Sequence, residues 1–328
     1  MRAKTTPTLP KTWSIRAAPL PPSPLRNLKM YLQNQKGPQF SRIGKNNFCE
    51  SPLRNPVIPM ELLMFSKKLA EYEIREAGKI ISNMGLDGVD LTVRPGGHIE
   101  PEEAVERLPG AVEVLGSEGL TVPMISTGIR SAEEKWSREI FSTASKCGIG
   151  YLKLGYWHYE GFGNVRRQLE DSRSKAAKLA ELASEHGVVA GIHIHSGNYM
   201  SATGGMVERI LDGIDTEYLG AYIDPGHMVL EGGRSGWRLG MDLLRDVIRM
   251  VAVKDFGWER NPKWEENWNL LHMPLSQGMV PWEEVFENLR EVGFDGPVSL
   301  HSEYEMTTDQ IIQQTARDVA YIKNFIHR

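Results

Sequence analysis

The chain has 328 residues, of which 41% are hydrophobic and 24% charged, the composition of an ordinary globular protein with one large core or two smaller ones. No apolar run approaches the roughly 20 residues of a membrane span, which argues against a membrane protein. Two cysteines, Cys49 and Cys147, are too few for a disulfide framework, so we expect a reducing compartment and a cytoplasmic location.

The first 49 residues carry nine Lys or Arg and no Asp or Glu, so the rest of the chain has a formal charge of −13. An acidic body disfavours nucleic acid as a partner. Residues 1–57 are rich in Pro, Asn, Gln and basic residues without a repeating apolar face, and we predict an unstructured basic extension. There are two alternative interpretations of this extension. It is an organelle transit peptide, or the reading frame is over-extended and translation starts at Met60.

Residues 58–328 alternate short apolar runs with helical patterns. We expect strands at 61–66, 88–93, 121–127, 151–157, 188–195, 219–224, 250–255 and 297–303. Eight such units in about 270 residues favour a closed parallel (β/α)8 TIM barrel of the α/β class. A doubly wound open sheet is the alternative, although neither a GxGxxG fingerprint nor a Walker loop is present.

Aromatic residues gather after two of the expected strands. Tyr156, Trp157 and Tyr159 follow the fourth strand. A connection of about 25 residues after the seventh strand carries Trp258, Trp264 and Trp268, and its length predicts a binding loop. These side chains suit stacking on sugar rings, and packing of the loops against the barrel is the alternative role.

Seven of the nine histidines follow or end an expected strand: His98, His158, His193, His195, His227, His272 and His301. Active sites of parallel barrels lie at these strand ends. Alternation along a strand puts His193 and His195 on one side, and His301 and Glu303 on one side. We expect these four to converge with Asp224, which ends the sixth strand and leaves His227 in the following loop.

Imidazoles beside carboxylates can bind a transition-metal ion or transfer protons. Lys254, at the end of the apolar seventh strand, could neutralise these carboxylates or act as an acid or base. The alternative is a surface lysine paired with Asp255. No glycine-rich phosphate cradle is clear after the last strands, so the need for a substrate phosphate stays open.

Several motifs occur in the order FSKKLAEY, GLDGVDLTVRPGGHIEPEE, IHIHSG, YIDPGHMVLEGG, VAVKDFGW, PLSQGMVPWEEVF and GFDGPVSLHSEYE. From about Met60 onward the chain thereby resembles the xylose isomerase-like TIM barrel family, often called sugar phosphate isomerase/epimerase. The resemblance implies the barrel fold and one of several activities, including isomerase, epimerase, dehydratase, lyase and endonuclease IV-like repair enzyme.

The resemblance also implies a divalent metal ion, since relatives of the tagatose 3-epimerase kind bind one through Glu, Asp, His and Glu on strands five to eight. This chain keeps Asp224 but has His193 in place of the first glutamate and Ala252 in place of the histidine. On strand eight, either His301 or Glu303 matches. We therefore expect Mn, Mg or Zn at His193, Asp224 and Glu303, with the Lys254 ammonium as the alternative cation.

These observations favour an isomerase or epimerase that moves a proton next to a carbonyl of a sugar or keto-sugar. The expected catalytic residues are His195, His227, Lys254 and Glu303. The expected substrate-binding residues are His98, Trp157, Tyr159, Trp258 and His301. A keto-sugar lyase or dehydratase and a non-catalytic carbohydrate-binding barrel are the alternatives. We expect a small-molecule sugar as the partner, no nucleic acid and no membrane; a homo-oligomer is compatible with the sequence.

Overall fold

The computed structural model describes residues 60–260 and 268–326. All of them belong to one compact unit, Pro56–Arg328. The extension predicted at residues 1–57, and Trp264, lie outside the described residues. Within the described part, no helix is long and apolar enough to cross a membrane.

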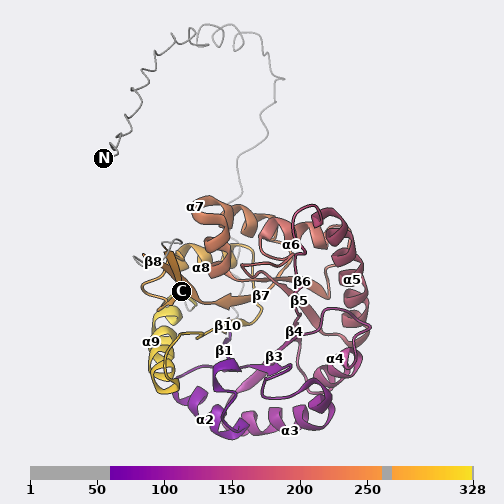
Figure 1. Ribbon diagram of the computed structural model, residues 1–328. Coiled ribbons are helices and arrows are strands. Elements are labelled where there is room, and N and C mark those ends of the chain that lie inside the picture. Colours follow the sequence, from indigo (N-terminus) through magenta and orange to yellow (C-terminus); the bar gives the residue numbers. More distant parts are fainter. Residues whose placement is uncertain (1–59, 261–267, 327–328) are drawn as a thin grey trace, which may run out of the picture. The chain divides into compact units, whose positions relative to one another are not determined.

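Parallel strands form a closed barrel, with the helices around it in Figure 1. The strands are β1 (Leu62–Phe65), β2 (Gly88–Val93), β3 (Thr121–Thr127), β4 (Tyr151–Lys153), β5 (Val189–His193), β6 (Leu219–Ile223), β7 (Ile248–Val253) and β10 (Val298–Leu300). The barrel closes where β1 pairs in parallel with β10. The predicted TIM barrel and its eight strands are confirmed, although β4, β5 and β10 end earlier than the expected strands at 151–157, 188–195 and 297–303.

The helices that cover the strands are α2 (Ile74–Asn83), α3 (Ala104–Ser117), α4 (Ser137–Lys146), α5 (Val165–His186), α6 (Gly204–Leu211), α7 (Pro225–Leu243), α8 (Trp282–Glu291) and α9 (Thr308–Ile326). Short 3-10 turns lie at Ser66–Leu69 and Pro101–Glu103. The longest helix, α5, ends where Gly187 takes φ 63°, a left-handed conformation that costs glycine little. The apolar faces of the helices and the outward faces of the strands form the main core.

Helix α7 begins directly after β6, and this corrects the prediction that His227 lies in a loop. Asp224 caps the helix, since its Oδ1 accepts the backbone N–H of His227 at 3.1 Å. Pro225 takes the first helical position, where a missing N–H costs nothing. The Pro-Gly pair that suggested a loop is therefore a helix start, and His227 is held in the first turn beside Asp224.

A two-stranded antiparallel sheet occupies much of the expected binding loop, a second correction. Strand β8 (Asp255–Arg260) pairs with β9 (Trp268–Met273). Trp258 and Trp268 remain 51% and 60% exposed, and both lie in the part of the pairing farthest from Asp255 and Met273. The expectation that this segment closes over a substrate stays a prediction.

The interior of the barrel changes from apolar to polar along the strands. Leu63, Met124, Tyr222, Met250 and Ala252 form an apolar cluster that is separate from the main core. Side chains of a strand alternate between the interior and the outside of the barrel. The residue two positions after each member of this cluster therefore also points inward, one layer closer to the carboxyl ends of the strands. Those next positions on β3, β4, β6 and β7 are Ser126, Lys153, Asp224 and Lys254.

Candidate functional site

Buried charged and imidazole side chains gather at the carboxyl ends of the barrel strands. We call this set the lumen cluster, and it comprises Asp90, Lys153, His193, Asp224, His227, Lys254, His301 and Glu303. Asp224 is fully buried, and Lys153 and Lys254 are 4% and 3% exposed. Burying charge is costly unless the groups pair, so a buried set of this size at a barrel's catalytic end indicates a functional site.

Lys254 lies between two carboxylates. Its Nζ is 3.3 Å from Asp224 Oδ2 and 3.2 Å from Glu303 Oε2. Lys67 also bonds to Glu303, through Oε1. The alternative of a surface lysine paired with Asp255 is therefore wrong.

Asp255 does not contact Lys254 and instead has a structural role. Its carboxylate accepts the backbone N–H groups of Phe256, Met279 and Val280 and the indole N–H of Trp282. Burial nevertheless raises the pKa of Asp255 to about 6. Lys254 thus belongs to the candidate site, whereas its neighbour Asp255 stabilises the surrounding structure.

The ring of His193 has both nitrogens engaged. Its Nε2 lies 3.3 Å from Asp224 Oδ2, and its Nδ1 lies 2.8 Å from the hydroxyl of Tyr156. Since a carboxylate only accepts, Nε2–H donates to Asp224 and Tyr156 O–H donates to Nδ1. The ring also stacks on Tyr222 at 4.3 Å between centroids. This arrangement fixes both the tautomer and the orientation of His193.

His195 and His227 lie against each other, with ring centroids 3.8 Å apart. His195 Nδ1 is 2.9 Å from the backbone oxygen of Ser196, so Nδ1 carries the proton and Nε2 holds a lone pair. The Ser196 hydroxyl hydrogen-bonds with His227 Nδ1 at 2.7 Å. His195 is half-buried and is the imidazole of this pair best placed to reach a substrate.

The far wall of the lumen is built around Asp90 and His301. Ser126 and Ser299 donate to Asp90 Oδ2 at 3.1 and 2.8 Å, while Asp90 Oδ1 has no hydrogen-bond partner in the described chain. His301 hydrogen-bonds with the Tyr222 hydroxyl at 2.9 Å. Its ring stacks on Phe65 at 4.3 Å. His301 is thus held firmly within the cluster, next to an unsatisfied carboxylate oxygen.

The lumen keeps its carboxylates charged and its imidazoles neutral. Burial opposes ionisation of Asp224 and Glu303, but the neighbouring Lys254 and imidazoles outweigh it and hold both pKa values below the usual range. Burial, reinforced by Lys254, lowers the pKa of His195 to about 4 and those of His193 and His301 well below their usual value. At neutral pH these rings are proton acceptors or neutral hydrogen-bond partners.

The titration of these groups predicts loss of stability in mild acid. Six imidazoles of the described chain have pKa values below that of an unfolded histidine: His98, His193, His195, His227, His272 and His301. Three carboxyls act in the opposite sense, since burial raises the pKa of Asp318 and raises those of Asp90 and Asp255 to about 6. Around pH 5 the unfolded chain therefore binds about two more protons than the folded chain, which lowers the free energy of unfolding by about 3 kcal/mol per pH unit. Urea midpoints from pH 7 to pH 5 measure this, and a constant midpoint would contradict it.

The arrangement of the predicted metal ligands does not fit a divalent ion. His193 has no free ring nitrogen, and both oxygens of Glu303 contact lysines. Among residues 60–260 and 268–326, no three His, Cys, Asp or Glu side chains are grouped to hold a metal ion. The metal set His193, Asp224 and Glu303 stays a prediction, and no chemical step is derived through it.

The structure brings most of the sequence-predicted catalytic residues together but separates the aromatic ones. His195, His227, Lys254, Glu303 and His301 lie in or beside the lumen cluster, as described above. His98 lies instead with Ser66 and Thr92, its Nδ1 3.1 and 3.4 Å from their hydroxyls.

The aromatic residues after β4 also differ from one another in surroundings. Trp157 is buried and donates its indole N–H to the backbone oxygen of Arg130 at 2.9 Å. Tyr159 packs against the main core, and Trp258 projects from the hairpin. Their predicted substrate-binding roles are untested.

Sequence reasoning missed Asp90 and Lys153. Each is the single charged residue in an otherwise apolar or uncharged strand, GVDLTV for β2 and YLK for β4. A charged residue seldom occupies a strand that is buried on both faces. That signal could have identified both residues before the structure.

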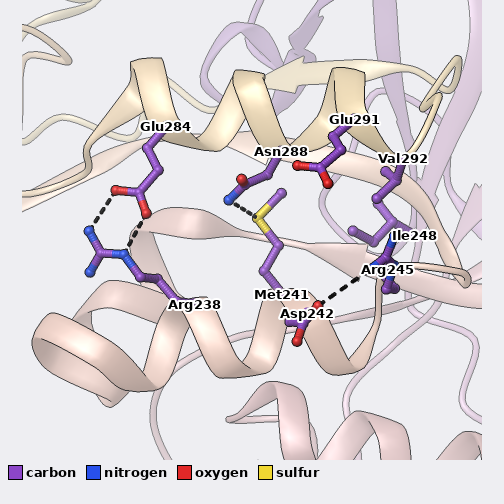
Figure 2. A pocket seen from close by; sticks show the side chains of 9 residues that line it. All are labelled: Arg238, Met241, Asp242, Arg245, Ile248, Glu284, Asn288, Glu291 and Val292. Carbon is purple, nitrogen blue, oxygen red and sulfur yellow. Dashed lines mark hydrogen bonds and ion pairs between the residues drawn. The ribbon is translucent and has the colours of Figure 1, made fainter. Parts of the chain in front are cut away.

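Two cavities differ in their relation to the lumen cluster. A cavity of about 280 Å³ lies between α7 and α8, on the outside of the barrel wall (Figure 2). The ion pair of Arg238 with Glu284 bridges the two helices at one end of this cavity, and no residue of the lumen cluster lines it. A second cavity of about 370 Å³ is lined by Tyr156, Trp157 and His158. Tyr156, which lines this second cavity, also hydrogen-bonds to His193 through its hydroxyl, whereas no residue of the lumen cluster lines the cavity.

Comparison of the sequence with known protein families and proteins gives a family match and a distant relative. Residues 79–325 match a family described as xylose isomerase-like TIM barrel. The uncharacterised protein MJ1311 of Methanocaldococcus jannaschii is 24% identical over 145 residues, which are 42% of this chain and 45% of that protein. The alignment thus spans less than half the length of this curated relative.

Solved structures share the barrel at low sequence identity. A 3-keto-D-glucoside 4-epimerase from E. coli has a TM-score of 0.62 and 15% identity, over 81% of this chain and 99% of that chain. A protein from Mycobacterium smegmatis in complex with magnesium has a TM-score of 0.62 and 15% identity, over 82% and 96%. A probable 3-DHS dehydratase from Bacillus anthracis has a TM-score of 0.59 and 15% identity, over 78% and 97%. At these identities the likeness concerns the fold.

Proposed function

The chain belongs to the xylose isomerase-like TIM barrel family, and we propose that it is a sugar isomerase or epimerase that moves a proton at a carbon next to the carbonyl of a keto-sugar. The observation that carries this proposal is the lumen cluster, in which neutral imidazoles lie beside buried cations at the carboxyl ends of the strands. Proton abstraction next to a carbonyl needs both a base and a group that accepts the developing charge. The solved 3-keto-D-glucoside epimerase supports a sugar as the substrate.

His195 is the base in this proposal. It is neutral at pH 7, since its pKa is lowered to about 4, and its Nε2 carries the lone pair because Nδ1–H faces the backbone oxygen of Ser196. The adjoining His227 ring keeps His195 in place at 3.8 Å. A base with so low a pKa is weak, so the carbon-bound proton must first be made acidic by a cation near the carbonyl.

Lys254 and Lys153 supply positive charge in the same lumen. Lys254 is engaged by Asp224 and Glu303, and its ammonium keeps both carboxylates ionised. Ionised Glu303, whose side chain is 13% exposed, can then accept a hydrogen bond from a sugar hydroxyl. In this arrangement Lys254 and Glu303 orient the substrate, and His195 moves the proton.

Exchange of deuterium from heavy water into a keto-sugar tests the proposal. The panel is D-fructose, D-tagatose and a 3-keto-D-glucoside, each followed by NMR with the full chain. We expect uptake at the carbon next to the carbonyl for at least one sugar, and a drop of about 10²- to 10⁴-fold with His195→Asn. His186→Asn is the matched control, because His186 lies in the last turn of α5. No exchange with any sugar, or equal exchange in both variants, would contradict the assignment.

An eliminating lyase is the second candidate function. The similarity to the probable 3-DHS dehydratase favours it, because loss of water from a keto compound begins with the same proton abstraction. The same incubations distinguish it, since elimination removes water and lowers the mass of the sugar by that amount. A non-catalytic sugar-binding barrel would bind a sugar in calorimetry without exchange or elimination. A cytoplasmic location and the oligomeric state stay predictions.

A further inference from the structure

The two lysines of the lumen cluster have opposite surroundings. Lys254 contacts two carboxylates, at 3.3 and 3.2 Å. Lys153 has no hydrogen bond or ion pair from its Nζ to any described residue, and its Nζ lies 3.8 Å from the ring centroid of Tyr156. Lys153 is nevertheless 4% exposed, so its amine is buried without a compensating anion in contact. Burial without an anion favours the uncharged amine, and the face of the Tyr156 ring offsets only part of this effect.

The electrostatics around Lys153 agree with its geometry. Burial, together with the nearby charges of Arg94 and Lys254, lowers the pKa of Lys153 to about 7, against the opposing pull of Asp90. About half of the molecules then carry a free amine at neutral pH. Free amines add to carbonyl carbons, and lysines desolvated in this way form Schiff bases in enzymes.

The neighbours of Lys153 come from β3 and from the segment that follows β4. Its strand neighbour in register is Ser126 on β3, which donates to Asp90. On its other side, the amine lies over the ring of Tyr156, and Tyr156 is also among the residues that line the cavity of about 370 Å³.

We propose that Lys153 forms an imine with the ketone carbonyl of the keto-sugar and thereby takes up the electron pair released when the neighbouring carbon loses its proton. This inference rests on the proposed function and names its electrophile. It supplies the electrophile that proton removal needs, because a protonated imine acidifies the adjacent C–H bond more strongly than a ketone does. It also gives the two lysines separate roles, covalent for Lys153 and orienting for Lys254.

The proposed steps balance without any oxidant or reductant. The Lys153 nitrogen attacks the carbonyl carbon, the C–O bond breaks, and the oxygen leaves as water, so that a protonated C=N bond remains. His195 Nε2 takes the proton from the adjacent carbon, and the electron pair moves to nitrogen as an enamine. Return of a proton to carbon and addition of water regenerate the ketone and the free amine.

Asp90 is placed to supply the proton for the departing oxygen. Its Oδ1 has no hydrogen-bond partner in the described chain, and it is close enough for its charge to act on Lys153. Burial raises the pKa of Asp90 to about 6, against the hydrogen bonds from Ser299 and Ser126. A carboxyl with this pKa can give and regain a proton near neutral pH.

Reductive trapping tests the inference. The full chain is incubated at pH 7 with sodium cyanoborohydride and either hydroxyacetone, the smallest α-hydroxy ketone, or D-fructose, and the adduct is located by intact mass and peptide mapping. We expect one adduct per chain, on Lys153, and at least tenfold less labelling of Lys175, an exposed lysine paired with Asp171. Lys153→Arg should abolish the adduct, whereas Lys175→Arg should retain it.

The pH dependence of labelling keeps the test independent of the variants. In the wild-type chain, labelling of Lys153 should rise to half its maximum near pH 7, about three pH units below surface lysines. Absence of an adduct on Lys153, or labelling no faster than that of Lys175, would overturn the imine. Deuterium exchange without an adduct would leave the proposed function standing and remove the imine alone. An adduct without exchange would show a reactive amine at Lys153 but would contradict the proposed function and the role of the imine in it.

Discussion

Replacing Lys254 by methionine should lower the free energy of unfolding by about 3–5 kcal/mol, because it leaves two carboxylates buried without their cation. Lys254 is 3% exposed and contacts Asp224 and Glu303, and methionine has a similar length without the charge. The loss is measured by urea unfolding at pH 7.

The matched control is Lys175→Met. This lysine also pairs with a carboxylate, Asp171 at 2.8 Å, but its side chain is 38% exposed. Its replacement should cost less than about 1 kcal/mol, since water screens exposed pairs. Equal losses in both variants would show that the Lys254 pairs are not the buried interaction described here.

Lys254→Met also tests whether the lysine or a metal ion neutralises the carboxylates of Asp224 and Glu303. With Lys254 in place, the carboxylates of Asp224 and Glu303 already have a positive partner, and calorimetry with Mn²⁺ should show no stoichiometric binding. Lys254→Met removes that partner, and we expect Mn²⁺ binding to appear and to restore part of the lost stability. Stoichiometric Mn²⁺ in the wild-type chain, lost in Asp224→Ala, would instead establish the metal site predicted from the sequence.

Replacing Asp224 by alanine should be at least as damaging, with a loss of about 3–5 kcal/mol and at least a 100-fold decrease in deuterium exchange. The carboxylate is fully buried and serves three groups. Its Oδ2 faces Lys254 and the Nε2–H of His193, both at 3.3 Å, and its Oδ1 caps α7 through His227 N–H. Alanine removes all three interactions at once.

Asp224→Asn separates the charge from the cap. Asparagine is as good an N-cap as aspartate, so α7 keeps its first-turn bond, while Lys254 and His193 lose a charged acceptor. We expect the asparagine variant to recover about 1 kcal/mol relative to alanine, the usual contribution of a cap, without recovering exchange. Equal stability of the two variants would show that the Asp224 cap does not hold α7. Recovery of exchange by asparagine would show that the charge of Asp224 is not needed for proton transfer.

Local sequence determined the barrel and the side of each strand that faces its interior. Apolar runs bounded by glycine and polar residues placed all eight strands, because a parallel strand covered on both faces must be apolar over its length. Two-residue alternation then put His193, His301 and Glu303 on inward positions, and the end of β6 supplied Asp224. These are properties of short segments, which is why the sequence alone specified them.

The local sequence did not determine the secondary structure of two segments, because the composition of each is compatible with two structures. The glycine-rich run after Asp224 fits a loop as well as a helix, and the cap on His227 N–H decided for α7. The long tryptophan-bearing segment fits a loop as well as a hairpin, and pairing of β8 with β9 decided that case. In both, the deciding hydrogen bonds depend on geometry that composition does not encode.

Tertiary structure alone decided which side chains became partners. Asp90 receives the hydroxyl of Ser299, 209 residues away, only because β1 and β10 close the barrel. Pairing of β7 with β6 and with β10 gives Lys254 two carboxylates, whereas Lys153 on β4 has none in contact, although both are lysines at the ends of apolar strands. A lysine's charge and reactivity depend on the distance to anions and on exclusion of water, and both are set by strands far apart in the chain.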